Sequence, residues 1–473
     1  MYGDFSRDTF AADKRLSRVL LQQGRVLLDA DWNEQTAILL HYLRTLAADI
    51  LGPAAGPGDS FKIVIKSEAR QAMLSIDAGH YYVDGILCEN DLAVGADGSA
   101  AALDYYNQEY PTPDLPAPPF LVYLDVWERT ITAAEDDTIR EVALGGADTA
   151  ARAKVVWQAK VTDTKPAGVA DFPADPAAAE RDWAQWVEQW QPRARGQLRA
   201  RAGQAAGAEL AAGVVPPDAR YRGVENQLYR VEVHTGGPAW SDAADGAAVR
   251  PGATFKWSRE NGAVVFPIRM LAGADDDQLA TLAYPWRDDR SGLRADDWVE
   301  ILDDDTVLGG RPGRLARVIA VEREGPRVRL RVPAGADELP AYTEDSSKHP
   351  LLRRWDYRAG DSNRGGLTLA ADGAATIVEG QGDHGWLALE DGIQIQFQDA
   401  GVTYRTGDYW LIPARTATGG VEWPGAPDRP EPREPRGVEH HYAPLATILR
   451  QDGKLQVADL RRTFEGYGKA ATG

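Results

Sequence analysis

The stretch DDWVEILDDDTVLGGRPGRLARVIAVEREGPRVRLRVP, residues 296–333, is the clearest guide to how this chain folds. A strand-like run comes first, an acidic turn and a glycine-rich turn follow, and two segments of alternating apolar and polar residues end the stretch. Because successive side chains of a strand point to opposite faces, this alternation places the apolar side chains together on one face. Short strands joined by tight turns predict a small barrel.

Strand patterns extend over most of the chain. Residues 60–170 predict a β domain, because runs rich in Val, Ile, Tyr and Trp alternate with turns of Gly, Pro and Asp. Residues 215–345 predict a second β domain that contains the barrel, with a type I′ turn at Asn261-Gly262. Residues 350–473 continue in β and include a Pro-rich loop, 422–437, that we expect to be mobile or to lie over a surface. The fold is therefore expected to be mainly β, with several β-sandwich and small-barrel modules.

The N-terminal residues 1–52 differ from this pattern, since an irregular arm leads into an amphipathic helix predicted from residue 32 to residue 51. The apolar residues that recur at helical spacing are Trp32, Leu39, Leu43, Leu46 and Ile50. Asp31 and Glu34 have the spacing of a capping box, in which both side chains accept backbone N–H groups at the helix start. A calcium loop beginning at Asp29 would instead need Gly at its sixth position and Glu at its twelfth, where the chain has Glu34 and Leu40.

Residues 176–212 predict a helical insertion between the β domains. Its first part places Trp183, Trp186 and Trp190 on one helical face, and the Ala- and Arg-rich run after them has high helix propensity. A tryptophan face of this kind is more often a buried seam than a platform for a ligand.

Metal and cofactor sites have little support in the sequence. The acidic run Asp303, Asp304 and Asp305 follows a strand and is a weak calcium candidate, but consecutive carboxylates usually form a solvated loop. His440 and His441 are neighbours that would point to opposite faces of a strand, so they are not expected to share a metal. The single cysteine, Cys88, is expected to pack as a small apolar residue. We expect no metal and no cofactor.

Composition excludes several classes of function. The net charge is −19, with 71 acidic and 52 basic residues, which disfavours nucleic acid as a partner. The first 20 residues are charged throughout, and no apolar run has membrane-spanning length, so we expect neither a secretory signal nor a membrane span, and synthesis in the cytoplasm. The sequence contains no GxSxG, HExxH, GxxxxGK[ST] or strand-linked GxGxxG motif, so we do not expect an enzyme.

Two N-terminal phrases carry a family resemblance: GDFSRDTF, residues 3–10, and RLSRVLLQQGRVLLDADWNEQ, residues 15–35. They resemble the opening of a large uncharacterised bacterial family that is encoded in gene clusters of phage-tail-like contractile injection systems. The later fragments TFKWSRENG and DWVEILDD resemble the same family. The resemblance implies a non-enzymatic structural or adaptor component near the baseplate or the fibres. It also implies assembly in the cytoplasm and release with the particle on lysis.

In that role the arm and helix would attach the chain to baseplate, sheath, tube or fibre proteins, or to a second copy in a homo-oligomer. Phe5 and Phe10 would be anchors, Arg7, Arg18 and Arg25 would make polar contacts, and Gly24 would allow close backbone approach. The alternative is that the arm folds back on its own β domain. The alternative function is a protein that binds or hydrolyses carbohydrate, based on the 14 tryptophans and the acidic loops, and carried by such a particle.

Overall fold

The structure is a computed structural model of the whole chain. It describes residues 1–68, 71–91, 102–110, 112–193, 195–203, 220–240, 251–274, 276–286, 290–322, 325–333, 339, 342–343, 347–398 and 401–465. The chain divides into two compact units, and each unit is assembled from three separate segments. Unit 1 comprises residues 1–8, 130–152 and 194–437, and unit 2 comprises residues 9–129, 153–193 and 438–473. The sequence suggested consecutive domains instead, because strand pairing between distant segments leaves no local signal.

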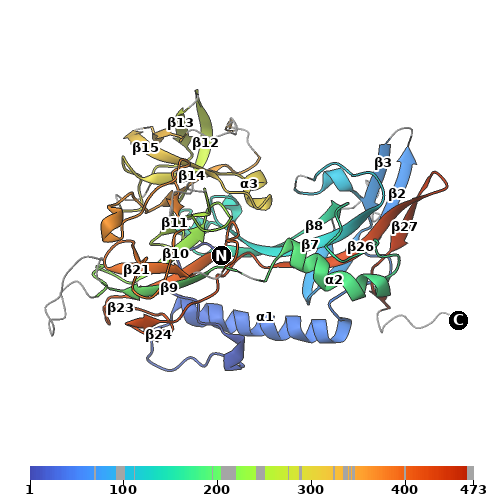
Figure 1. Cartoon of the computed structure of the whole chain (residues 1–473), viewed down its shortest axis with the longest axis horizontal. Helices are drawn as coiled ribbons and strands as arrows, with labels where there is room; N and C mark the ends of the chain where they lie inside the picture. The colour runs from blue at the N-terminus through green and yellow to red at the C-terminus, as the bar shows by residue number, and fades with distance from the viewer. Residues whose placement is uncertain are drawn as a thin grey trace, which may run out of the picture. The chain divides into compact units, whose positions relative to one another are not determined.

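Unit 1 contains a closed six-stranded barrel with the strand order β12-β13-β16-β15-β14-β17 (Figure 1). Its strands are β12 (Val265–Ala274), β13 (Asp277–Leu282), β14 (Trp298–Leu302), β15 (Arg314–Glu322), β16 (Arg327–Arg331) and β17 (Leu351–Trp355). The barrel is confirmed around residues 296–333, and three further strands close it. In β16 the alternation is regular, since Val328 and Leu330 are buried inside while the three arginines of the strand are exposed.

Two more sheets complete unit 1. A five-stranded sheet has the order β18-β11-β10-β22-β23, and a four-stranded sheet joins β19, β21 and β20 with β9 added beside β21. Their strands are β9 (Gln197–Ala202), β10 (Gln227–Val233), β11 (Thr254–Ser258), β18 (Ala375–Thr376), β19 (Glu379–Gly380), β20 (Leu387–Ala388), β21 (Ile393–Gln398), β22 (Tyr409–Arg415) and β23 (Gly420–Val421). The Pro-rich loop forms the small hairpin of β24 (Gly425–Ala426) and β25 (Arg429–Pro430) and lies over this unit, where Trp410 Nε1 donates to Arg433 O at 2.9 Å.

Unit 2 is built from three sheets, with orders β28-β1-β4-β5, β2-β3-β6 and β27-β26-β7-β8. Their strands are β1 (Ala54–Pro57), β2 (Ile63–Glu68), β3 (Gln71–Ile76), β4 (Gly79–Val83), β5 (Ile86–Asn90), β6 (Leu103–Asp104), β7 (Phe120–Ile131), β8 (Arg152–Thr162), β26 (His440–Gln451), β27 (Lys454–Asp459) and β28 (Thr463–Phe464). The inward side chains of these sheets share one core, which includes Cys88 on β5. The antiparallel pairing of β26 with β7 joins segments more than 300 residues apart.

The described residues contain three α-helices, α1 (Asp29–Leu51), α2 (Pro176–Trp190) and α3 (Asp304–Leu308). Short 3₁₀ helices are formed by Ala12–Lys14, Tyr105–Asn107, Asp137–Ile139, Val142–Leu144 and Ser362–Arg364. A mainly β fold of barrel and sheet modules, with an N-terminal helix and a helical insertion, is thus confirmed.

The helical insertion is shorter than predicted. Its first part is correct, because α2 begins after Asp175, whose side chain caps the helix by accepting from Ala178 N at 2.8 Å. The tryptophan face is buried as expected: Trp186 is fully buried, and Trp190 stacks on Tyr123 with ring centroids 4.0 Å apart. The helix predicted beyond residue 190 is wrong for residues 197–202, which form β9. Pairing with β21 overrides the helix propensity of this Ala- and Arg-rich segment. Residues 204–212 lie outside the described part of the chain.

The capping-box prediction is also wrong. Helix α1 begins at Asp29, its N-cap residue is Leu28, and no side chain caps it. Asp31 therefore lies inside the first turn, where its charge still suits the helix dipole. Glu34 accepts a hydrogen bond from Thr9 Oγ1 at 2.7 Å, so a contact with the arm occupies the carboxylate that a capping box would use.

Candidate functional site

The first eight residues belong to unit 1 and lie against its β10 and β11 strands. The guanidinium of Arg353 lies 3.5 Å from the centre of the Tyr2 ring, and that of Arg230 lies 4.0 Å from the same ring. Arg230 also lies 3.5 Å from the ring of Tyr409. The Tyr2 hydroxyl donates to Glu232, with its two carboxylate oxygens at 2.8 and 2.9 Å. These residues form an alternating stack of cations and aromatic rings, which is favourable when water is excluded.

A network of buried charges continues from this stack between the five-stranded sheet and the barrel. Glu232 on β10 lies directly opposite Lys256 on β11, with Oε1 and Nζ 3.2 Å apart. Lys256 Nζ donates to both oxygens of Glu300 at 2.6 Å, and Glu300 also accepts from Trp355 Nε1 at 2.9 Å. All four side chains are buried, so this network depends on pairing, since an unpaired charge there would be very costly.

The pairing shifts the pKa values of the network. Burial alone would raise the pKa of Glu232, but the charges of Arg230 and Lys256 outweigh it and lower that pKa to about 2. The pKa of Glu300 is lowered in the same way, chiefly because Lys256 offsets its burial. His234 is buried beside Lys256, and both effects lower its pKa to about 4. At neutral pH the network therefore holds ionised carboxylates and a neutral histidine.

Sequence reasoning missed this network. YRVEV and TFKWS alternate apolar and charged residues, which is typical of a strand with one solvated face. In the structure β10 and β11 are buried on both faces, because the barrel strand β14 and the N-terminal residues cover the charged side. A signal was available in the opposite charges of Arg230, Glu232 and Lys256.

Two of the residues predicted to bind a partner are engaged inside unit 1. The ring of Phe5 closes over Gly3, where an added Cβ would lie 2.5 Å from Phe5 Cζ, so only glycine fits at that position. Arg7 forms an exposed ion pair with Glu422 at 3.4 Å. For residues 1–8 these contacts correspond to the alternative in which the arm folds back on its own chain.

The rest of the arm, residues 9–28, belongs to unit 2 and contacts α1 at a few points. The Phe10 ring lies 5.6 Å from the His41 ring, and Val19 N donates to the side chain of Gln35 at 2.8 Å. Arg18 and Arg25 are exposed. Gly24 has a φ of +73° and open space around the position of a Cβ, so it serves a turn rather than a close approach within the chain.

Helix α1 binds unit 2 through its less apolar side. Ala30 and Ile38 are its buried residues, and Arg44 makes a bidentate ion pair with Glu128 at 2.8 and 3.0 Å. The backbone of Arg44 also packs so closely on Gly85 that a Cβ there would lie 2.1 Å from the Arg44 carbonyl oxygen. The face that carries Trp32, Leu39, Leu43, Leu46 and Ile50 points to solvent. The sequence identified the apolar face of this helix correctly, but its own fold does not cover that face.

Exposed apolar side chains are concentrated in this part of the molecule. Among the described residues, 13 of the 27 exposed large apolar side chains lie between residues 16 and 50, a small fraction of the chain. We call this set the α1 surface: Leu16, Leu20, Leu21, Val26, Leu27, Leu28, Trp32, Leu39, Leu40, Tyr42, Leu43, Leu46 and Ile50. Single exposed apolar residues are ordinary, whereas a concentration of this kind marks a binding surface.

The acidic run after β14 forms the start of helix α3. Asp303 caps α3 by accepting from Thr306 N at 2.8 Å, and it also accepts from the Tyr342 hydroxyl at 3.0 Å. Asp304 contacts His349 Nδ1 at 2.7 Å, and Asp305 pairs with Lys348. Each carboxylate thus has its own partner, and no group of three potential metal ligands occurs within the described residues.

The adjacent histidines also have separate partners. On β26, His440 Nδ1 lies 2.7 Å from Asp125 and His441 Nδ1 lies 2.8 Å from Asp84. This agrees with the expectation that neighbours on a strand do not converge on one ion.

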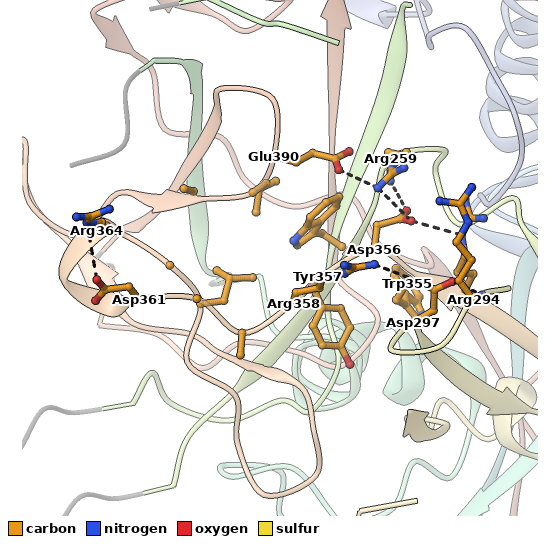
Figure 2. A pocket seen from close by; sticks show the side chains of 18 of the residues that line it. Arg259, Arg294, Asp297, Trp355, Asp356, Tyr357, Arg358, Asp361, Arg364 and Glu390 are labelled. Atoms are coloured by element: carbon orange, nitrogen blue, oxygen red, sulfur yellow. Dashed lines mark hydrogen bonds and ion pairs between the residues drawn. The ribbon is translucent and has the colours of Figure 1, made fainter. Parts of the chain in front are cut away.

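A pocket of about 650 Å³ opens in unit 1 beside the ends of β11, β14 and β17. Figure 2 shows Arg259 joined to both Glu390 and Asp356, Arg358 directed toward Asp297, and Arg364 toward Asp361. Arg259 Nη2 lies 2.8 Å from Glu390 Oε2 and 3.6 Å from Asp356 Oδ1. Burial, with a contribution from Asp356, raises the pKa of Glu390 to about 7 although Arg259 opposes the shift. This pocket could not be predicted from the sequence, because its residues come from turns between distant strands.

Comparison with known proteins adds one finding. The family of unknown function DUF6519 matches residues 1–175 and 183–456. The chain belongs to this family. Searches of curated proteins and of solved structures find no match to the DUF6519 chain.

Most tryptophans of the DUF6519 chain are buried or partly buried. All 14 lie within the described residues, and only Trp32, on the α1 surface, is exposed. Trp257 and Trp355 line the pocket but are at most 2% exposed, so neither offers a ring face to a sugar. None of the described helices has the length and apolar character of a membrane span.

Proposed function

We propose that this DUF6519 chain is a non-enzymatic structural or adaptor component that binds another protein through the α1 surface. The observation that carries the proposal is the solvent exposure of the whole apolar face of α1, with Trp32 at 66% and Ile50 at 70% exposed. Burial of apolar surface stabilises a complex by about 25 cal/mol per Å² before the costs of association. A surface of this composition therefore favours a bound state over an exposed one.

The identity of the partner is a further part of the proposal. The phrase RLSRVLLQQGRVLLDADWNEQ, residues 15–35, supplies seven members of the α1 surface. Because this phrase resembles a family encoded with phage-tail-like contractile injection systems, we propose a baseplate or fibre protein of such a particle as the partner. Assembly in the cytoplasm and release with the particle on lysis belong to the same proposal.

The charge of the arm supports a protein partner with an acidic rim. Lys14, Arg15, Arg18 and Arg25 are exposed beside the apolar residues, whereas the whole chain carries a net charge of −19. A basic rim around an apolar patch gives a complementary surface both orientation and a faster association rate.

The test is a triple variant, Leu39→Ser, Leu43→Ser and Leu46→Ser, produced in cells that carry the injection-particle genes. We expect its co-purification with particles to be lost, since three exposed anchors of one helix face are removed. The matched control changes Met270 and Leu279, exposed apolar residues of the barrel, to serine and should co-purify normally. Normal incorporation of the triple variant would contradict docking through the α1 surface.

A second possibility is that the α1 surface joins two copies of this chain. Size-exclusion chromatography with light scattering of the isolated chain tests this possibility. If the wild type is a dimer and the triple variant is a monomer, the α1 surface joins two copies of this chain. That result would replace the adaptor proposal with a homo-oligomer.

A further inference from the structure

The pocket in unit 1 is lined by an unusual concentration of arginines for an acidic chain. Among the described residues, six arginines and four carboxylates line it, while the whole chain has fewer basic than acidic residues. The arginines are Arg259, Arg290, Arg294, Arg354, Arg358 and Arg364, and the carboxylates are Asp297, Asp356, Asp361 and Glu390. Its volume of about 650 Å³ is in the range of small-molecule sites.

Several buried hydrogen-bond donors in the pocket lining make no hydrogen bond within the protein. Within the described residues, Arg259 Nε and Trp257 Nε1 are buried and have no hydrogen-bond partner, whereas the buried Arg354 Nε makes no hydrogen bond but lies 3.4 Å from Asp356 Oδ1. The Tyr357 hydroxyl, which can donate or accept, is the only other pocket-lining atom in this condition. Since buried donors are normally paired, a surplus of donors favours a ligand that supplies acceptor oxygens.

Arg259 is the residue at which such a ligand would bind. Its side chain is one-third exposed, and its nearest carboxylate is Glu390 Oε2, at 2.8 Å. Glu390 is itself held by the Tyr229 hydroxyl at 3.1 Å. The guanidinium of Arg259 therefore already binds an oxyanion, which the protein supplies from its own turn after β20.

We propose that this pocket binds a small molecule through a carboxylate or phosphate group, which replaces the Glu390 carboxylate at Arg259. The proposal does not depend on the α1 surface, because all of these residues lie within unit 1.

Replacement of Glu390 couples binding to a proton. The charged and titratable groups that face Glu390 are Tyr221 before β10, Tyr229 from β10, Arg259 after β11, Asp356 after β17 and the neighbouring Asp391. With its pKa near 7, Glu390 is mostly neutral at pH 6 and mostly ionised at pH 8. A ligand that needs the neutral form should bind about tenfold more weakly at pH 8 than at pH 6, because the competent fraction falls by about that factor.

The experiment is isothermal titration calorimetry of the full chain with sulfate and with acetate as probes, at matched ionic strength in chloride. Both probes keep a constant charge between pH 6 and pH 8, so any pH dependence comes from the protein. Sulfate represents a tetrahedral phosphate-like group and acetate a carboxylate, so the tighter probe identifies the chemical source. We expect saturable binding of one probe, weaker at pH 8, with proton uptake seen as a dependence of the heat on the buffer.

Two variants decide the assignment. Arg259→Gln should lose at least tenfold in affinity, while Arg327→Gln, which removes an exposed barrel arginine, should bind as the wild type does. Glu390→Gln should bind equally at both pH values and more tightly than the wild type at pH 8. The absence of saturable binding by the wild type would overturn the proposal, and so would unchanged binding by Arg259→Gln. If Arg259→Gln does not fold, the test rests on Glu390→Gln. The proposal would then be overturned if the affinity of this variant for the probe depended on pH as strongly as that of the wild type.

Discussion

Residues 1–8 and residues 9–51 are adjacent and both contain aromatic and basic side chains, yet they have opposite surroundings. In the first segment Tyr2 lies between two guanidinium groups and donates to a buried carboxylate. In the second, Trp32 is 66% exposed, and the other large apolar side chains on the same face of α1 are exposed too. An aromatic side chain near the N-terminus is therefore buried where charged groups are available to pair with it, as for Tyr2, and stays exposed where they are not, as for Trp32. The buried charges of β10 and β11 hold the first segment, whereas α1 is held by Arg44 and leaves its leucines free.

The largest expected effect is in the network beneath the first segment. Glu232→Ala should lower the free energy of unfolding by about 3–5 kcal/mol, because Arg230 and Lys256 would remain buried without this carboxylate. Urea unfolding followed by tryptophan fluorescence measures the change. The control Glu422→Ala removes an exposed carboxylate that pairs with Arg7 and Arg415, and it should cost about 0–1 kcal/mol. Equal costs for both variants would contradict a pairing-dependent network.

The second-largest effect on the free energy of unfolding is expected for Tyr2 of the first segment, compared with Trp32 of the second. Tyr2→Ala should cost about 3 kcal/mol, since it removes the ring between Arg230 and Arg353 as well as a hydrogen bond to Glu232. Tyr2→Phe retains the ring and should cost less than half of this. If Tyr2→Ala and Trp32→Ala have the same effect in the urea assay, residues 1–8 do not hold unit 1 as described.

The pH dependence of stability separates two carboxylates of unit 1. The lowered pKa of Glu232 contributes stability above pH 4.5 that is lost as the pH falls toward 2. The raised pKa of Glu390 has the opposite sign: its contribution is fully present below pH 4.5 and is lost as the pH rises through 7. Glu390→Gln should therefore remove a decline of about 2 kcal/mol between pH 5 and pH 8. A wild-type slope that survives in this variant would mean that another group titrates.

The smallest effect is expected on the α1 surface. Trp32→Ser and Leu43→Ser should each change the stability of the isolated chain by less than about 0.5 kcal/mol, because both side chains are more than half exposed. Thermal unfolding of the monomer is a sufficient measurement. A loss above about 1 kcal/mol would show that the chain itself covers this face.

Much of the fold class was predictable from local pattern. The alternation in residues 327–331 predicted a barrel strand, and the structure buries Val328 and Leu330 as expected. Asn261-Gly262 predicted a tight turn of left-handed backbone, and both residues have positive φ, at 49° and 64°. The apolar faces of α1 and α2 were also predictable, because the spacing of apolar residues along a helix can be taken from the sequence alone.

The candidate sites were predictable only in part. The arm and helix were predicted to be an attachment element; in the structure Phe5 lies against Gly3 and Arg7 pairs with Glu422, while Arg18, Gly24 and Arg25 lie in the exposed arm. The pocket was not predicted, since Arg259 and Glu390 are 131 residues apart and meet only through sheet pairing. Neither composition nor local sequence pattern predicts a contact between residues so far apart in the sequence.

The sequence by itself determined the period of each element, the positions of its turns and the side on which each element is apolar. Tertiary structure alone decided that residues 197–202 became a strand, that α1 began without its capping box, and which apolar faces were covered. The physical reason is that local preferences are worth a few tenths to about 1 kcal/mol per residue, while long-range pairing and burial contribute more. Trp186 of α2 is buried within the chain, whereas the apolar face of α1 is exposed.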